Sequence, residues 1–121
     1  MQQTYKDKPV KEISCDELIQ LLSFDARVKL VDVLNHSHYK KEHIKGAISL
    51  PIRVVRECAK KHLNKDDTII TYCANFKCPA STDAAKILLS LGYKNVFDYK
   101  GGLADYKKAN LLLEGSLYAA K

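Results

Sequence analysis

The sequence lacks any apolar run approaching the roughly 20 residues that a membrane-spanning helix needs. Its first nine residues are a polar arm without the apolar segment of a signal peptide. It also contains no internal repeat and no low-complexity segment. We therefore expect one cytoplasmic domain over residues 1–121 that has no membrane partner.

A metal-binding pattern is also missing. The four cysteines stand at positions 15, 58, 73 and 78, and neither their spacing nor that of the histidines at 36, 38 and 43 matches a zinc framework. We expect no metal and no cofactor, and we expect these histidines to face solvent. In a reducing compartment, all four cysteines are expected to be thiols rather than structural disulfides.

The net charge of +6 does not point to nucleic acid. The lysines are spread along the chain in pairs, such as Lys40-Lys41 and Lys107-Lys108, and acidic residues lie among them. Aromatic residues do not interleave with them, as they do on surfaces that stack single-stranded bases. We expect solvated basic faces that aid solubility and weakly attract small anions.

The stretch Thr68–Ser81 combines a strand, a loop and the start of a helix. Its apolar beginning is typical of a buried parallel strand. Apolar residues at helical spacing follow, up to Gly92, where the helix is expected to stop. Ligands bind at the carboxyl ends of such strands, and a helix N-terminus favours anions. Cys73, which opens the loop, is therefore predicted to be an activated thiol.

The rest of the chain alternates strand and helix patterns. Strands are predicted around residues 10–13, 28–34, 47–50 and 93–99, and helices over residues 52–62 and 103–108. Ser14 and Glu17 form a capping box that begins a further helix. This alternation predicts an α/β domain with a mainly parallel sheet covered on both faces, and residues 111–121 are expected to pack back on it.

Several segments resemble the rhodanese-like family, in the same order as in that family. They are Leu30–Val33, Glu42–Pro51, Ile70–Cys73, Leu91–Val96 and Tyr99–Tyr106. The resemblance covers roughly residues 10 to 114. It implies a three-layer domain with a five-stranded sheet, in which Cys73 carries a persulfide. Sulfane sulfur would pass from an anionic donor such as thiosulfate to a thiol or cyanide acceptor.

The resemblance also implies a set of substrate-binding residues in the loop. Backbone N–H groups around Cys73 would bind the thiolate, the persulfide and the oxyanion of the donor. The loop residues concerned are Ala74, Asn75, Phe76, Lys77, Pro79 and Ala80. The chain departs from the family pattern at Leu34, where an arginine is common, and at Glu42, where a glycine is usual. Its loop is also about two residues longer than in short-loop members and holds a second cysteine.

Three further residues receive expected roles. Lys77 either attracts the anionic donor or is a solvated loop lysine. Cys78 is either a resolving thiol, which accepts the sulfur or closes a disulfide with Cys73, or a packing residue at the helix start. Asp32, at a strand end, is expected to support loop backbone N–H groups rather than to carry a proton.

Two alternative functions remain open from the sequence. A non-catalytic rhodanese-like module would bind proteins, but such modules typically lack the cysteine that this chain retains. A phosphatase or arsenate reductase on the same scaffold needs an arginine six residues after the nucleophile, where this chain has Pro79. Nothing in the sequence indicates an oligomeric state.

Overall fold

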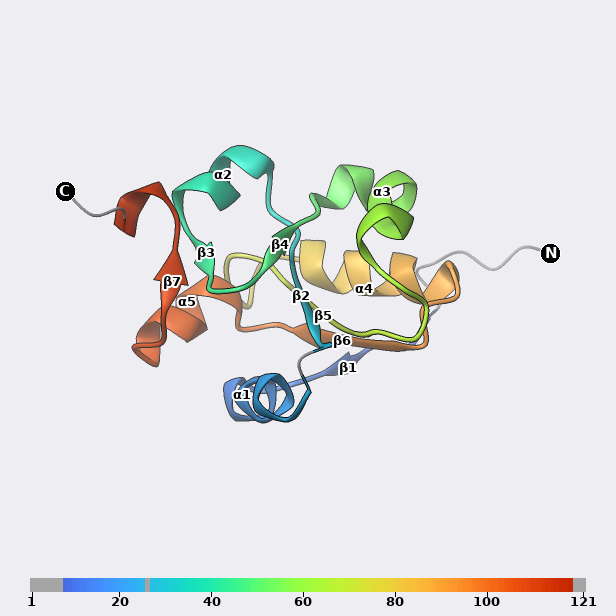
Figure 1. Ribbon diagram of the computed structural model, residues 1–121, viewed down its shortest axis with the longest axis horizontal. Coiled ribbons are helices and arrows are strands. Elements are labelled where there is room, and N and C mark those ends of the chain that lie inside the picture. The colour runs from blue at the N-terminus through green and yellow to red at the C-terminus, as the bar shows by residue number, and fades with distance from the viewer. Residues whose placement is uncertain (1–7, 26, 119–121) are drawn as a thin grey trace.

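The computed structural model describes residues 8–25 and 27–118 (Figure 1). Most of the predicted polar arm, and the last three residues of the tail, lie outside this part. The elements are β1 (Lys11–Glu12), α1 (Cys15–Phe24), β2 (Lys29–Asp32), α2 (His36–Lys41), β3 (His43–Ile44), β4 (Ile48–Ser49), the 3₁₀ turn η2 (Ile52–Val54), α3 (Val55–His62), β5 (Thr68–Tyr72), α4 (Ala80–Ser90), β6 (Asn95–Tyr99), α5 (Gly102–Lys108), β7 (Leu113–Glu114) and the 3₁₀ turn η3 (Ser116–Tyr118). None of the described helices is long and apolar enough to span a membrane.

Five strands form one parallel sheet in the order β1-β6-β5-β2-β4. Strand β5 lies at the centre, where Ile70 is in register with Leu30 of β2 and Phe97 of β6. The predicted α/β class and its parallel five-stranded sheet are confirmed. The central place of β5 matters for the site, because the loop after Tyr72 leaves the sheet between two neighbouring strands.

Helices cover both faces of this sheet (Figure 1). Helices α3 and α4 pack on one face with Ile69, whereas α1 and α5 pack on the other with Ile70. Both isoleucines are fully buried. Successive side chains of a strand point to opposite faces, so the short apolar run of β5 contributes to both halves of the core.

The ends of the helices follow from local chemistry. The backbone N–H of Glu17 donates to Ser14 Oγ at 3.1 Å, and the backbone N–H of Ser14 donates to Glu17 Oε1 at 2.9 Å. This reciprocal pair confirms the predicted capping box of α1. Gly92, just after α4, has φ +99°, a conformation that glycine adopts without steric cost.

A second, two-stranded sheet was not predicted. Strand β7 pairs antiparallel with β3, and the hydroxyl of Tyr118 donates to Glu42 Oε2 at 2.9 Å, so residues 111–118 lie against the domain. The expectation that His43 faces solvent is wrong. Its ring is buried and stacks on Tyr39 at 3.8 Å, while its Nε2 lies 3.4 Å from Glu114 Oε1. The paired residues, such as His43 and Glu114, lie far apart along the chain, and a pairing of this kind leaves no local pattern in the sequence.

Candidate active site

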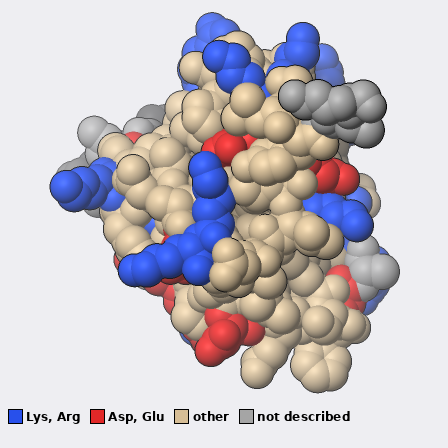
Figure 2. Space-filling model, turned by 90° about the vertical axis from the view of Figure 1, so that its left-hand side faces the viewer, with Lys and Arg blue, Asp and Glu red and all other residues tan. Residues whose placement is uncertain are grey.

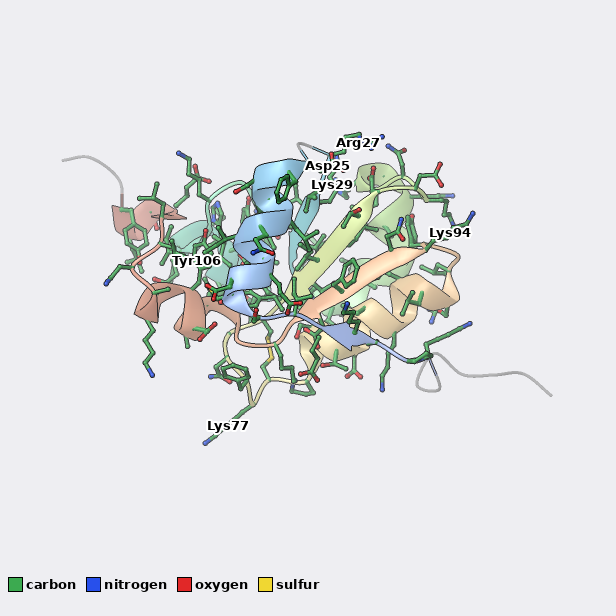
Figure 3. The ribbon with its side chains drawn as sticks, turned by 90° about the horizontal axis from the view of Figure 1, so that it is seen from below. Asp25, Arg27, Lys29, Lys77, Lys94 and Tyr106 are labelled. Atoms are coloured by element: carbon green, nitrogen blue, oxygen red, sulfur yellow. A yellow bond between two sulfur atoms is a disulfide. The ribbon has the colours of Figure 1, made fainter. Side chains whose placement is uncertain are left out.

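The candidate site is the loop of residues 73–79, which joins β5 to α4 at the carboxyl edge of the sheet. Cys73 follows β5 directly and is 1% exposed. It is joined by a disulfide to Cys78, with a Cα–Cα distance of 6.3 Å (Figure 3). The backbone N–H of Cys78 donates to Asn75 O at 3.2 Å, and that of Lys77 donates to Asn75 Oδ1 at 2.9 Å. This tight turn brings the two cysteines together.

The disulfide corrects the expectation that all four cysteines are thiols. Cys15 and Cys58 are free, whereas Cys73 and Cys78 are bonded. The pairing is one of the alternatives predicted for Cys78 from the sequence, and it depends on the turn at Asn75. In this form Cys73 has no thiol, so any nucleophilic chemistry at Cys73 requires prior reduction.

The start of the loop is held by helix α5. The backbone N–H groups of Leu103 and Ala104 donate to the carbonyl oxygens of Cys73 at 3.0 Å and of Ala74 at 2.9 Å. Gly102 makes this approach feasible: its φ is +61°, and a Cβ atom there would overlap the carbonyl group of Cys73. This close contact joins two positions 29 residues apart along the chain, so no local pattern in the sequence predicts it.

Several backbone N–H groups around the loop remain available. Within residues 8–25 and 27–118, no protein group accepts a hydrogen bond from the N–H of Ala74, Asn75 or Phe76. The first turn of α4, which opens at Ala80, likewise presents N–H groups that its own helix cannot use. Such groups at a loop and a helix N-terminus favour an anion, whether a thiolate, a persulfide or the oxyanion of a substrate.

Side chains of the loop and of the β6–α5 turn add to this site. Lys77 is exposed and points away from the domain (Figure 3). Phe76 is also exposed, at 63%, and reaches a pocket of about 480 Å³. Lys100 lines the same pocket, and its Nζ donates to Cys78 O at 2.8 Å. Lys100 was not predicted as a site residue, because its hydrogen bond joins positions 22 residues apart along the chain.

Asp32 belongs to a buried network beneath the loop. It is fully buried, and it accepts hydrogen bonds from the backbone N–H of Leu34 at 2.9 Å and from the hydroxyl of Tyr72 at 2.7 Å. The same hydroxyl accepts the backbone N–H of Ile44 at 3.0 Å. Burial raises the pKa of the Asp32 carboxyl and also that of the Tyr72 phenol. These contacts tie β2 and β3 to the residue that precedes Cys73.

The N-terminus of α4 is fixed in a similar way. Thr71 of β5 donates through Oγ1 to the carbonyl oxygen of Ser81 at 2.8 Å. Thr82 donates through Oγ1 to Asp98 Oδ2 of β6 at 2.5 Å. These side chains were not predicted from the sequence as site residues. They hold the N-terminal end of α4, which closes the site, against β5 and β6.

Replacing Tyr72 with phenylalanine tests the buried network. The change leaves the Ile44 N–H and one oxygen of Asp32 without their partner, so we expect the free energy of unfolding to fall by about 2–3 kcal/mol. Urea unfolding measures this loss. Tyr118→Phe is the matched control, because the Tyr118 hydroxyl donates a hydrogen bond to Glu42 at the surface. This substitution should lower the free energy of unfolding by at most about 0.5 kcal/mol. Equal losses in the two variants would contradict the account of the network.

The described residues contain no group of three or more His, Cys, Asp or Glu side chains arranged to hold a metal ion. On the face shown in Figure 2, lysine and arginine side chains lie singly or in small groups, with uncharged surface between them. The described residues on this face therefore form no continuous basic stripe of the kind that follows a nucleic-acid backbone.

Comparison with known proteins links this geometry to one family. The family model described as rhodanese-like domain matches residues 14–109. The chain is 37% identical over 76 residues to the thiosulfate sulfurtransferase PspE of Escherichia coli. The matched residues make up 62% of this chain and 70% of that protein. It is 36% identical over 85 residues, or 64% of its length, to a tRNA uridine(34) hydroxylase of Buchnera aphidicola, of which it spans 26%.

A solved structure agrees with the fold. The rhodanese-like domain of the Alr3790 protein from Anabaena superposes with a TM-score of 0.81 at 27% identity, covering 93% of this chain and 85% of that one. The similarity therefore extends over nearly the whole chain, including the site loop. The chain spans only about a quarter of the hydroxylase, however, so the activity of that whole enzyme is not carried over with the domain.

Proposed function

Because the chain belongs to the rhodanese-like domain family, we propose that it is a sulfurtransferase that carries sulfane sulfur on Cys73. The observation that supports this most is the placement of that cysteine. It is buried at the end of the central strand, in a loop where the backbone N–H groups of Ala74, Asn75 and Phe76 have no protein acceptor within residues 8–25 and 27–118. Such a loop stabilises a thiolate and binds an anionic donor such as thiosulfate.

In the first half of the reaction, the Cys73 thiolate attacks the outer sulfur of thiosulfate. The sulfur–sulfur bond of the donor breaks, sulfite leaves with its electron pair, and Cys73 becomes a persulfide. The free N–H groups of Ala74, Asn75 and Phe76 stabilise the negative charge on the donor and then on the persulfide. Lys77, on the exposed side of the loop, attracts the donor from solution over a longer range.

The second half of the reaction takes one of two routes. A thiolate or cyanide acceptor attacks the outer sulfur, which regenerates the Cys73 thiolate. Alternatively, the Cys78 thiolate attacks the inner sulfur, so that hydrosulfide leaves and the Cys73–Cys78 disulfide forms. The Cys73–Cys78 bond in this structure is the same bond that this second route would form, so the two sulfurs are within reach of each other. A dithiol, which is available in a reducing cytoplasm, would then restore both thiols.

A direct assay tests this proposal against the alternatives. The reduced chain is supplied with thiosulfate and either cyanide or a dithiol, and formation of thiocyanate or hydrosulfide is followed. We expect turnover with both acceptors and no hydrolysis of a phosphate ester. Phosphate-ester hydrolysis would favour the phosphatase, whereas no reaction with either substrate class would favour the non-catalytic binding module.

Cys78→Ser separates the two routes. Without Cys78 the internal disulfide cannot form, so the persulfide on Cys73 should last at least about tenfold longer in the absence of an acceptor. Turnover with dithiols should slow, while cyanide turnover continues. Mass spectrometry of the loop peptide over time measures the lifetime of the persulfide. An unchanged lifetime, together with unchanged dithiol turnover, would leave Cys78 with a packing role only.

Reduced Cys73 should ionise more readily than a free cysteine. The unpaired N–H groups and the α4 N-terminus favour its anion, so we expect its pKa to lie below the roughly 8.5 of a free thiol. The rate of alkylation of Cys73 in the Cys78→Ser variant as a function of pH, followed on the loop peptide by mass spectrometry so that Cys15 and Cys58 do not contribute, measures this value. A midpoint at or above that of a free cysteine would remove the electrostatic reason for assigning the nucleophile to Cys73.

A further inference from the structure

The segment that leads from β6 into α5 contacts the site loop at both of its ends. The N–H groups of Leu103 and Ala104 hold the end at Cys73. Lys100 holds the other end, because its Nζ donates to the carbonyl oxygen of Cys78 at 2.8 Å. One short piece of chain, residues 100–104, therefore fixes the positions of both loop cysteines.

The surroundings of Lys100 favour this contact. Its side chain is half-buried and lines the 480 Å³ pocket beside the loop together with Tyr99. Asp105, a carboxylate in the same pocket, accepts a hydrogen bond from the Tyr99 hydroxyl at 2.7 Å rather than from the lysine. A hydrogen bond from an ammonium group is stronger than one between neutral groups, and partial burial reduces competition from water.

We infer that Lys100 is a positioning residue that holds Cys78 against Cys73 and thereby favours the internal disulfide over the dithiol. Holding one thiol near the other raises its effective concentration, which shifts the equilibrium toward the bonded pair. The inference deepens the proposed function, since it assigns control of the resolving step to a residue outside the loop. It needs only the two thiols and a reductant, not the sulfur donor.

The exchange that Lys100 controls is a balanced thiol–disulfide reaction. One thiolate of an added dithiol attacks a sulfur of the Cys73–Cys78 bond and forms a mixed disulfide, and the other loop cysteine leaves as a thiolate. The second thiol of the reductant then displaces the remaining loop cysteine. The protein gains two electrons and becomes a dithiol, and the reductant becomes a cyclic disulfide.

The test is a redox titration of the full chain. Wild type and variants are equilibrated with reduced and oxidised dithiothreitol at varied ratios, and the bonded fraction is measured by alkylation and mass spectrometry of the loop peptide. We expect Lys100→Met to reach half-reduction at a ratio of reduced to oxidised reagent roughly fivefold lower than wild type, since it loses one charged hydrogen bond. Lys100→Arg keeps a donor and should stay within about twofold of wild type.

Lys94→Met is the matched control, because Lys94 is exposed and lies away from the loop (Figure 3). A Lys100→Met midpoint equal to that of wild type would overturn the inference, as would an equal shift in Lys94→Met. A lowered thermal midpoint of the reduced Lys100→Met protein without a redox shift would assign Lys100 a structural role only, which also overturns the inference. None of these outcomes depends on sulfur transfer, so they are separate from the success or failure of the proposed function.

Discussion

Replacing Cys73 with serine should lower sulfur transfer from thiosulfate by at least about 10³-fold, because the persulfide has no other place to form. A serine hydroxyl at this position keeps nearly the same volume but is not ionised near neutral pH. The variant should therefore fold and still bind anions through the loop N–H groups. Steady-state assays of thiocyanate formation measure the loss, and circular dichroism checks the fold.

Cys58→Ala is the control for Cys73→Ser. Cys58 is a free cysteine of α3, outside the site loop in the chain, that packs against the core on the face covered by α3 and α4. We expect its sulfur-transfer rate to stay within about twofold of wild type, with a modest loss of stability from the missing sulfur atom. Full activity in Cys73→Ser, or an equal loss in Cys58→Ala, would contradict the assignment of the nucleophile.

Replacing Gly102 with alanine should have the largest effect on stability. Gly102 has φ +61°, which strains any residue with a Cβ atom, and that atom would also overlap the Cys73 carbonyl group. Relieving this overlap requires the N–H groups of α5 to move away from the loop. We expect the free energy of unfolding to fall by more than about 3 kcal/mol. Urea unfolding measures this loss, and activity should fall with it because the loop loses its anchor.

Gly46→Ala separates the strain of the backbone from the contact with the loop. Gly46 has φ +87°, but nothing lies within 4 Å of the place where its Cβ would be. Gly46→Ala should therefore lower the free energy of unfolding by only about 1–2 kcal/mol and leave the rate of sulfur transfer unchanged. If Gly102→Ala were no more destabilising than Gly46→Ala, the close approach of α5 to Cys73 would not contribute to the fold.

Much of the fold could be predicted because its signals are local. The apolar run of β5, the spacing of apolar residues in α4 and the Ser14–Glu17 capping box each depend on residues within a few positions of one another. The predicted ends of the strands and helices were less accurate. For example, the strand predicted over residues 28–34 extends only over Lys29–Asp32. Strand ends depend on pairing with neighbours, which the sequence does not display.

The candidate site was predicted only in part, because several of its contacts are long-range. The loop and Cys73 follow from the strand–helix transition, but the contacts from Leu103 and Lys100 join positions more than 20 residues apart. One of the two roles predicted for Lys77 was that of a cation that attracts the donor, because it belongs to the loop itself. It points into solvent, whereas Lys100 donates a hydrogen bond to the loop carbonyl of Cys78. The Cys73–Cys78 disulfide was one alternative predicted for Cys78, and the sequence alone could not decide between the alternatives because the bond depends on the turn at Asn75.

The most direct test of the central claim is mass spectrometry of the chain after reduction, removal of the reductant and exposure to thiosulfate. The account predicts a gain of one sulfur atom on the peptide that bears Cys73, most clearly in Cys78→Ser, where the persulfide cannot be resolved internally. The gain should disappear after cyanide is added. The absence of any added sulfur on this peptide in Cys78→Ser, or its appearance on Cys15 or Cys58 instead, would contradict the account.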